Sequence, residues 1–344
     1  STVDSGNLVA QLMTLRMALL ALPAEAPFSP HWCLGLADLL ALVRESLPAG
    51  AHLPALDRAD KLVLAACADM PVSAPRLQAA LETFEQAARE LLAAVEAALS
   101  GDAARNDTDA AQDSGEALRW ARSLVAQCEA GRDELAAFGG LALPLGPDPS
   151  PAALAAADQA PLPALGVLAS LGIGQSRAYL DRAEDLARRV DALSEQEQLF
   201  LYDDRRHLMA IGYNVDERTL DAGHYDLLAS EARLGVFTAI ARGQLPQESW
   251  FALGRLLTAH DGIPVLMSWS GSMFEYLMPP LIMPNYEQTL LEQTCRAAVR
   301  RQIDYGRERG VPWGISESGY NATDTALNYQ YRAFGVPGLG LKRG

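Results

Sequence analysis

The sequence predicts an all-α fold with one short β-hairpin. Apolar residues recur at helical spacing along most of the chain, and capping residues, glycine and proline mark where these segments start and stop. A strand-like pattern is confined to a short segment that begins at Phe200. No fixed-period repeat is visible, so we do not expect a repeat array.

The first part, residues 1–198, is expected to be a helical region. One helix should follow Ser29, a good N-cap residue, with Pro30 at its first position. A long amphipathic helix should end at Gly101, and the polar residues 101–115 should form a loop. Helical spacing resumes over residues 114–138 and again, after breaks rich in glycine and proline, over residues 174–198.

The second part, residues 199–344, has a different sequence pattern. Apolar residues flank a polar turn within residues 200–214, which predicts the hairpin. Helices are expected over residues 224–243, 245–257 and 286–310. Residues 262–284 should be a loop with a short helix. A loop rich in aromatic and hydrogen-bonding residues, 311–321, follows the last helix.

Charge and aromatic residues separate the two parts. Residues 1–199 hold 14 Lys+Arg and 27 Asp+Glu, a net charge of −13, whereas residues 200–344 hold 14 and 16, a net charge of −2. Of 23 aromatic residues, 17 lie from Phe200 onward. The total charge of −15 argues against nucleic acid and against an anionic membrane surface as partners. The aromatic part suits an uncharged ligand with flat faces.

The remaining bulk features indicate a protein without a metal site. The four cysteines lack the close pairs of a zinc site and are interpreted as free thiols, and the histidines show no ligand pattern. His207 is expected in a turn and His224 at a helix start. No apolar run approaches membrane-spanning length, so no direct membrane insertion is expected. Ser1 is not a natural start, which suggests a piece of a longer protein.

Two carboxylates lie in unusual surroundings. Glu231 is flanked by small residues in "LLASEAR", and Glu317 lies in "GISESGYN". A carboxylate pair can cleave a glycosidic bond, one group donating a proton and the other acting as nucleophile or as base toward water. The alternative interpretation makes Glu231 a helix carboxylate paired with Arg233 or Arg242, and Glu317 a loop carboxylate that caps a backbone amide.

Sugar binding would also need aromatic faces and short polar groups. The candidates for the faces are Trp269, Trp313, Tyr320, Tyr329 and Tyr331. The candidates for hydrogen bonds are Ser270, Ser316, Asn321 and Asn328. We expect Trp269, Trp313 and Tyr320 to share one concave surface. Further expected contacts to the ligand are Tyr225, Asp226, Arg233 and Glu275.

Several segments resemble the middle region of bacterial cyclic β-1,2-glucan synthases. They are "FLYDDRRHLMAIGYNVDERTLDAGHYDLLASEARLGVFTAIARG", "SWSGSMFEYLMPPLIM", "LLEQTCRAAVRRQIDYGRERGVPWGISESGYN" and "LNYQYRAFGVPGLGLKRG". The resemblance runs from about Phe200 to Gly344 and covers the part called the glycoamylase-like domain. Residues 1–198 resemble the preceding segment of the family only in helical character and position.

The resemblance implies an (α/α)6 toroid that cyclises linear β-1,2-glucan by transglycosylation with retention. It implies Glu231 as general acid/base and Glu317 as nucleophile. We expect no metal or organic cofactor, because carboxylates suffice for protonation and covalent catalysis. The parent would be a large inner-membrane protein, with this part on the cytoplasmic side between a glycosyltransferase and a phosphorylase-like part. The chain stops before the family domain does, so either helices of residues 1–198 contribute to the toroid or the toroid is incomplete at its C-terminal end.

Two other functions remain open from the sequence. Related folds hydrolyse the same linkage, so the chain could be an endo-β-1,2-glucanase. It could also be a non-catalytic helical scaffold between neighbouring domains. The products formed from linear β-1,2-glucan would distinguish these functions. A cyclising enzyme would form rings, an endoglucanase would form short linear chains, and a scaffold would form no product.

Overall fold

The computed structural model describes the chain except for residues 30, 49–50, 70–72, 103–107, 139–149, 151, 153–155, 157–158, 317, 331–332 and 342–344. It is 59% helix, which confirms the mostly helical prediction. Contacts divide the chain into two compact units, which differ from the two parts read in the sequence. One is residues 19–185, and the other joins residues 1–18 to residues 186–344.

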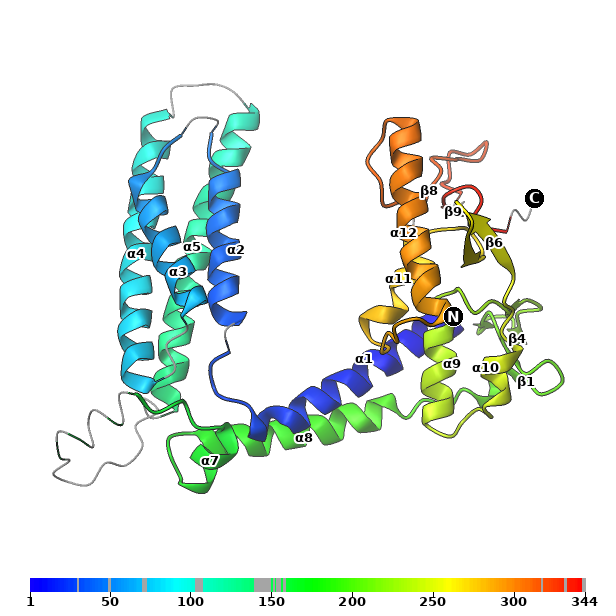
Figure 1. The fold of residues 1–344 in the computed structure, drawn as a ribbon, viewed down its shortest axis with the longest axis horizontal. Helices are drawn as coiled ribbons and strands as arrows, with labels where there is room; N and C mark the ends of the chain where they lie inside the picture. Colours follow the sequence, from blue (N-terminus) through cyan, green and yellow to red (C-terminus); the bar gives the residue numbers. More distant parts are fainter. Residues whose placement is uncertain are drawn as a thin grey trace. The chain divides into compact units, whose positions relative to one another are not determined.

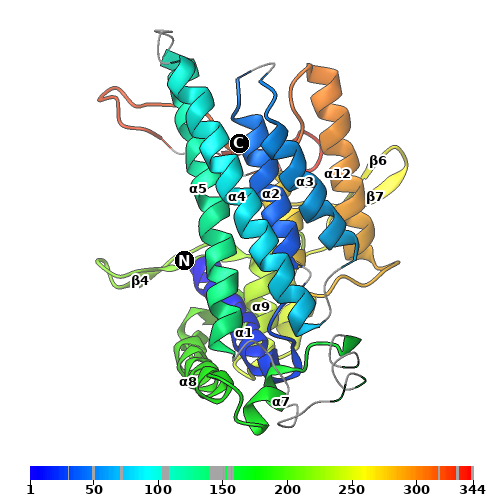
Figure 2. The ribbon, with the colours of Figure 1, turned by 90° about the vertical axis from the view of Figure 1, so that its left-hand side faces the viewer.

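The unit of residues 19–185 is built on four long helices. They are α2 (His31–Glu45), α3 (Pro54–Ala68), α4 (Ala74–Asp102) and α5 (Thr108–Ala137), which run side by side (Figures 1 and 2). Each contacts two neighbours, in the cyclic order α2, α3, α4, α5. Their facing sides bury Leu36, Leu40, Val43, Leu56, Val63, Leu91, Val95 and Leu124. Burial of these apolar stripes is what holds such helices together.

The end of this bundle is closed by a second cluster of apolar residues. It joins Phe28, Leu77, Leu81, Leu135, Phe138, Leu165 and Leu168. The short helix α7 (Leu165–Ser170) and the 3-10 turn η1 (Leu22–Ala24) contribute to this end. Gly131 is required beside it, because a Cβ there would lie 2.7 Å from the Trp32 ring.

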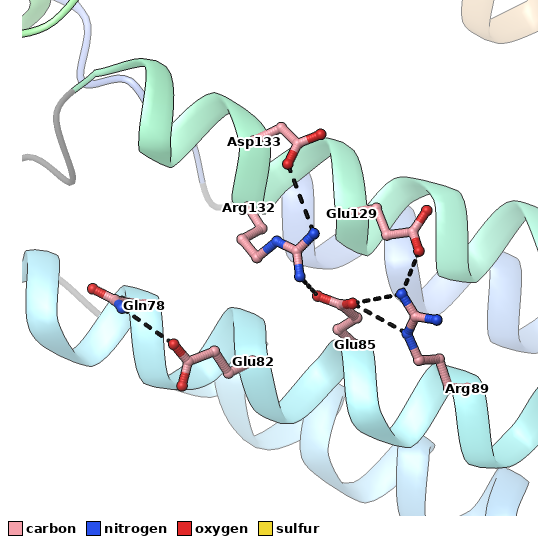
Figure 3. A network of polar contacts seen from close by, with 7 residues as sticks. All are labelled: Gln78, Glu82, Glu85, Arg89, Glu129, Arg132 and Asp133. Carbon is pink, nitrogen blue, oxygen red and sulfur yellow. Dashed lines mark hydrogen bonds and ion pairs between the residues drawn. The ribbon is translucent and has the colours of Figure 1, made fainter.

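A polar network ties α4 to α5 on one side of the bundle (Figure 3). The Glu85 carboxylate, 8% exposed, accepts hydrogen bonds from Arg89 at 2.8 and 3.1 Å and from Arg132 at 2.8 Å. Arg89 also donates to Glu129 on α5 at 2.5 Å. A nearly buried carboxylate is thereby matched by two guanidinium groups, which offsets its loss of hydration.

The helix limits predicted from the sequence hold at the start of α2 and fail between α4 and α5. The Ser29 hydroxyl accepts from the His31 amide at 3.2 Å, as an N-cap does. Residues 101–115 were expected to be a loop, but α4 continues to Asp102 and α5 begins at Thr108. Alanine and aspartate recur in this polar stretch, and helical structure extends through polar residues when the flanking turns are already fixed.

The other unit begins with α1 (Thr2–Ala21). With the turn after it, residues Thr2–Ala24 are long and apolar enough to cross a membrane, so the expectation that no such run exists is wrong. Mostly buried core helices and N-terminal signal sequences meet the same criteria of length and composition, and 11% of this window is buried. The start of α1 is packed here: the Thr2 hydroxyl donates to the Ala210 carbonyl at 2.6 Å. A Cβ on Gly6 would lie 2.5 Å from Gly235.

Short strands connect the helices of this unit. After α8 (Ser176–Ser194) and η3 (Leu199–Leu201), the antiparallel sheet β1-β2-β5 joins Tyr202–Asp203, Leu208–Ala210 and His224–Tyr225. The β1-β2 pair is the predicted hairpin, with Tyr202 opposite Met209. The sequence did not predict three further strand pairs. They are β3-β4 (Tyr213–Asn214, Thr219–Leu220), β6-β7 (Leu257–His260, Ile263–Leu266) and β8-β9 (Ser318–Gly319, Ala333–Phe334).

The remaining helices are α9 (Ala232–Ala241), α10 (Glu248–Ala252), α11 (Met273–Leu277) and α12 (Leu290–Arg309), with the 3-10 turn η4 (Pro279–Leu281). The short helix α11 confirms the one predicted within residues 262–284. The helix expected from residue 224 starts only at Ala232, because His224 pairs in β5. His224 therefore does not begin a helix. Gly310, at φ +65°, ends α12 as predicted.

The core of this unit lies between α9, α11, α12, β7 and the C-terminal residues 335–341. It buries Met209, Leu228, Val236, Leu253, Val265, Leu266, Tyr276, Ala298, Val336 and Leu339. Gly335 and Gly340 allow the C-terminal segment to touch residues 268–272: their Cβ atoms would lie 2.3 Å from the Ser270 oxygen and 2.4 Å from its carbonyl carbon. The arrangement of these helices as a toroid remains a prediction.

Candidate functional site

Glu231 stands at the start of α9. Its backbone is helical, at φ −59° and ψ −27°, and its side chain is half-buried. The preceding Ser230 is fully buried; its hydroxyl accepts from the Ala232 amide at 3.2 Å and donates to the Glu231 carboxylate at 3.3 Å. The sequence "ASEAR" therefore makes a tight entry into the helix, and the carboxylate is held beside a hydroxyl at the positive end of that helix.

Tyr225, on β5, lies within electrostatic range of this carboxylate, and Asp226 directly follows it in the chain. Burial, and next the negative charge of Glu231, raise the pKa of the Tyr225 phenol to about 12, so it keeps its proton. The Asp226 carbonyl accepts from the Gly254 amide at 2.6 Å. A Cβ on Gly254 would lie 2.9 Å from that oxygen, so this close approach requires glycine. Both predicted contact residues are half-buried.

Arg233 connects α9 to α11. It is 2% exposed, and burial lowers the pKa of its guanidinium to about 10, which leaves it charged at neutral pH. It donates to the Ser230 carbonyl at 3.0 Å, to the Glu275 carbonyl at 3.0 Å and to the Tyr276 carbonyl at 2.7 Å. These bonds fix the backbone around Glu231, and the expected contact of Arg233 to the ligand remains a prediction.

Glu275 organises the serine loop, which we define as residues 268–272. Its carboxylate is 5% exposed. Its oxygens accept from the backbone amides of Trp269 at 2.8 Å, Ser270 at 3.1 Å and Ser272 at 2.9 Å. They also accept from the hydroxyls of Ser268 at 3.1 Å, Ser270 at 2.5 Å and Ser272 at 2.9 Å. A carboxylate with so many protein donors holds the loop in place, and its expected contact to the ligand remains a prediction.

The serine loop presents two of the predicted ligand contacts. Trp269 and Ser270 are half-buried, while Ser268 and Ser272 are buried. The loop is also fixed from behind, because the Ser268 amide donates to the Leu339 carbonyl at 3.0 Å and the Val336 amide donates to the Gly271 carbonyl at 3.1 Å.

Gln302 joins the serine loop to the Trp313 loop, which we define as residues 311–316. Gln302 lies on α12 and is 1% exposed. Its Nε2 donates to the Ile315 carbonyl at 2.9 Å and to the Gly271 carbonyl at 3.3 Å, and its Oε1 accepts from the Ile315 amide at 2.8 Å. The Met273 amide donates to the same Ile315 carbonyl at 2.8 Å. The two aromatic loops therefore lie side by side.

The Trp313 loop carries exposed candidates for sugar contacts. Trp313 is 53% exposed, and Ser316 is also exposed. Gly306 makes room for the tryptophan, since a Cβ there would lie 2.9 Å from the Trp313 Cβ. Glu317 and Tyr331 lie outside the described residues. The expected single concave surface of Trp269, Trp313 and Tyr320 remains a prediction, although the loops bearing the two tryptophans are adjacent.

A second exposed loop follows, between β8 and β9. Asp324 shapes it by accepting from the amides of Ala326 and Asn328, both at 2.9 Å, and from the Asn328 side chain at 3.2 Å. These bonds, the Asn328 amide first, lower the pKa of the Asp324 carboxyl. The loop displays Tyr329, 56% exposed, and the predicted contacts Tyr320, Asn321 and Asn328 are exposed as well. The Tyr320 ring lies 4.7 Å from that of Phe334.

Sequence reasoning missed the residues that hold these loops together. The sequence pattern predicted no role for four of them, namely Gln302, Ser268, Gly335 and Gly340. A signal for Ser272 existed, because "SMFE" is a capping box, and the structure forms it between Ser272 and Glu275. Gln302 gave none, since one glutamine in an amphipathic helix is ordinary.

One cluster away from these loops has the composition of a cation site. The ligand atoms of His260, Asp261 and Asp304 lie within 4.8 Å of one another. His260 Nε2 is 3.0 Å from the Asp304 carboxylate, and this bond is the main cause of the lowered pKa of Asp304. The pair joins the β6-β7 hairpin to α12, which accounts for it without an ion. The absence of a cofactor remains a prediction.

We compared the sequence of the chain with those of known proteins. No family model matches the chain. Over 235 residues, 67% of the chain, the sequence is 43% identical to cyclic beta-(1,2)-glucan synthase NdvB of Rhizobium meliloti (strain 1021). This chain is similar to a segment of a cyclic β-1,2-glucan synthase. The resemblance seen in the motifs is confirmed. The matched stretch spans 7% of the length of that synthase.

Proposed function

We propose that this chain carries the glucan-processing site of a cyclic β-1,2-glucan synthase and closes linear β-1,2-glucan into rings. One observation supports the proposal most. A continuous path of hydrogen bonds leads from the entry of α9 through Arg233 to α11, across the serine loop, and through Gln302 to Ile315. In the sequence, one end of this path adjoins Glu231 and the other stands two residues before Glu317.

In the proposed reaction Glu317 attacks the anomeric carbon of a glucosyl unit, and the glycosidic bond breaks. Glu231 gives its proton to the leaving O2 oxygen. The O2 hydroxyl at the other end of the same glucan then attacks the glycosyl–enzyme intermediate and returns a proton to Glu231. The bond to Glu317 breaks and the ring is complete, with two inversions that amount to retention.

The surroundings suit these roles. The buried charge of Arg233 and the protonated Tyr225 lie close enough to Glu231 to interact with it electrostatically. Exposed aromatic rings on the Trp313 loop and the β8-β9 loop offer apolar faces to sugar rings. The linear substrate would come from a glycosyltransferase part of the parent protein, which would also have a phosphorylase-like part. We place the site on the cytoplasmic side of the bacterial inner membrane.

The test is incubation of the chain, alone and within its full-length protein, with linear β-1,2-glucan. Mass spectrometry distinguishes a ring from a linear chain of equal glucose number because the ring is lighter by one water. Rings support the proposal. Short linear chains would identify an endo-β-1,2-glucanase instead, and an unchanged substrate in both samples would leave only a scaffold role.

A further inference from the structure

We propose that Gln302 is a positioning residue for glucan transfer: it fixes the Trp313 loop against the serine loop in the arrangement that the reaction needs. This inference rests on the proposed function for its kinetic consequence. Its structural basis is independent of that function and consists of three hydrogen bonds made by one buried side chain.

The first argument concerns what holds the Trp313 loop. Residues 311–316 belong to no helix or strand, and Trp313 and Ser316 are exposed. Ile315 is only half-buried, yet its amide and its carbonyl are both bound by Gln302, at 2.8 and 2.9 Å. A side-chain amide that binds both groups of one residue imitates the pairing of a neighbouring strand. The backbone of the loop is therefore held by hydrogen bonds at Ile315 as a strand would be, although the loop belongs to no sheet.

The second argument concerns which atoms are essential. Gln302 Nε2 bridges two carbonyls, those of Ile315 and Gly271, so it ties the Trp313 loop to the serine loop. Only a group that donates and accepts at the same end can satisfy this site. Glutamine does so while neutral, and at 1% exposure its side chain has no contact with bulk water that could replace these bonds.

The third argument is the consequence for the reaction. Ser316 follows Ile315 directly, and the proposed nucleophile is the next residue in the sequence. A displacement of about 1 Å in a reacting group lowers turnover on the order of 100-fold. Loss of the Gln302 bonds should therefore act on turnover more than on glucan binding, which also uses the Tyr320 and Tyr329 faces.

The test compares Gln302→Met and Gln302→Glu with Gln293→Met and Gln293→Glu, which change an exposed glutamine on the same helix. In the active protein, Gln302→Met should lower kcat by about 10- to 100-fold and change KM by less than about threefold. Gln302→Glu should regain turnover at low pH. A protonated carboxyl can accept from the Ile315 amide and donate its one proton to one of the two carbonyls, whereas the ionised form can donate to neither. As the pH rises, Gln302→Glu should therefore lose activity at a lower pH than the wild type does. The Gln293 variants should keep the pH profile of the wild type.

Hydrogen exchange gives the readout that does not depend on activity. The Ile315 amide should exchange at least about tenfold faster in Gln302→Met, with amides in the middle of α12 unchanged. If exchange at Ile315 is unchanged, or if kcat and the pH profile of both Gln302 variants match the wild type, Gln302 is not a positioning residue. A wild-type protein that makes no rings would overturn the proposed function, while the exchange result would still decide whether Gln302 orders the loop.

Discussion

Replacement of Glu275 by glutamine is predicted to destabilise its unit by about 2–4 kcal/mol. One carboxylate oxygen accepts from the amides of Trp269 and Ser270, and the other accepts from the amide of Ser272. A glutamine must turn its NH2 group toward one of these sets, so at least one buried backbone donor faces another donor. Each unmatched buried donor costs about 1–3 kcal/mol, and the bonds that survive lose the assistance of the charge.

Thiol labelling in denaturant can measure this change in one unit at a time. Cys295 is buried in the same unit as Glu275, and Cys128 is buried in the four-helix unit, so each reports the opening of its own surroundings. A loss of about 2–4 kcal/mol corresponds to an increase of roughly 30- to 1,000-fold in the open fraction at Cys295. Labelling of Cys128 should stay unchanged. Glu287→Gln, at an exposed site, is the matched control. If Cys295 labelling in Glu275→Gln stays within about threefold of that control, the carboxylate does not stabilise the serine loop.

Three further predictions use the same reporters. Glu85→Gln should raise Cys128 labelling by about 5- to 30-fold, since it weakens bonds from two half-exposed arginines, and added salt should reduce the difference. Gly335→Ala should destabilise the unit of residues 1–18 and 186–344 and raise Cys295 labelling, because its Cβ would lie 2.3 Å from the Ser270 backbone oxygen. Gly35→Ala, in open space on α2, should be neutral or stabilising. Folding raises the pKa of Tyr225 from 10.0 to about 12, so its contribution to stability is complete below pH 10 and is lost as the pH rises toward 12. Tyr225→Phe should show a shallower loss in that window.

The sequence predicted those elements whose signals are local. The start of α2 at Ser29, the hairpin near Tyr202 and the end of α12 at Gly310 depend on residues within one turn of each other. The β6-β7 hairpin had a local signal too. Asp261-Gly262 is a two-residue turn with φ +50° and +76°, and the strands on either side of it replace part of the helix predicted over residues 245–257 and of the loop predicted over residues 262–284.

Other features could not be read because they depend on distant contacts. The start of α9 is displaced because β2, fifteen or so residues earlier, pairs with His224 and Tyr225. Arg233 and Glu275 look like ligand-binding residues in a sequence because their types bind sugars. Only burial, at 2% and 5% exposure, shows that their partners are protein groups. The role of Gln302 depends on its hydrogen bonds to two loops that lie apart in the sequence, the serine loop and the Trp313 loop.

The central claim is that Glu231 and Glu317 form the catalytic pair, and turnover of linear β-1,2-glucan by Glu231→Gln and Glu317→Gln in the full-length protein tests it most directly. Glutamine keeps the shape of each side chain but neither donates an acidic proton nor attacks the anomeric carbon. Each variant should therefore lose at least about 100-fold in turnover while glucan still binds, and Glu287→Gln should not. Near-normal turnover in either variant would contradict the assignment of that residue.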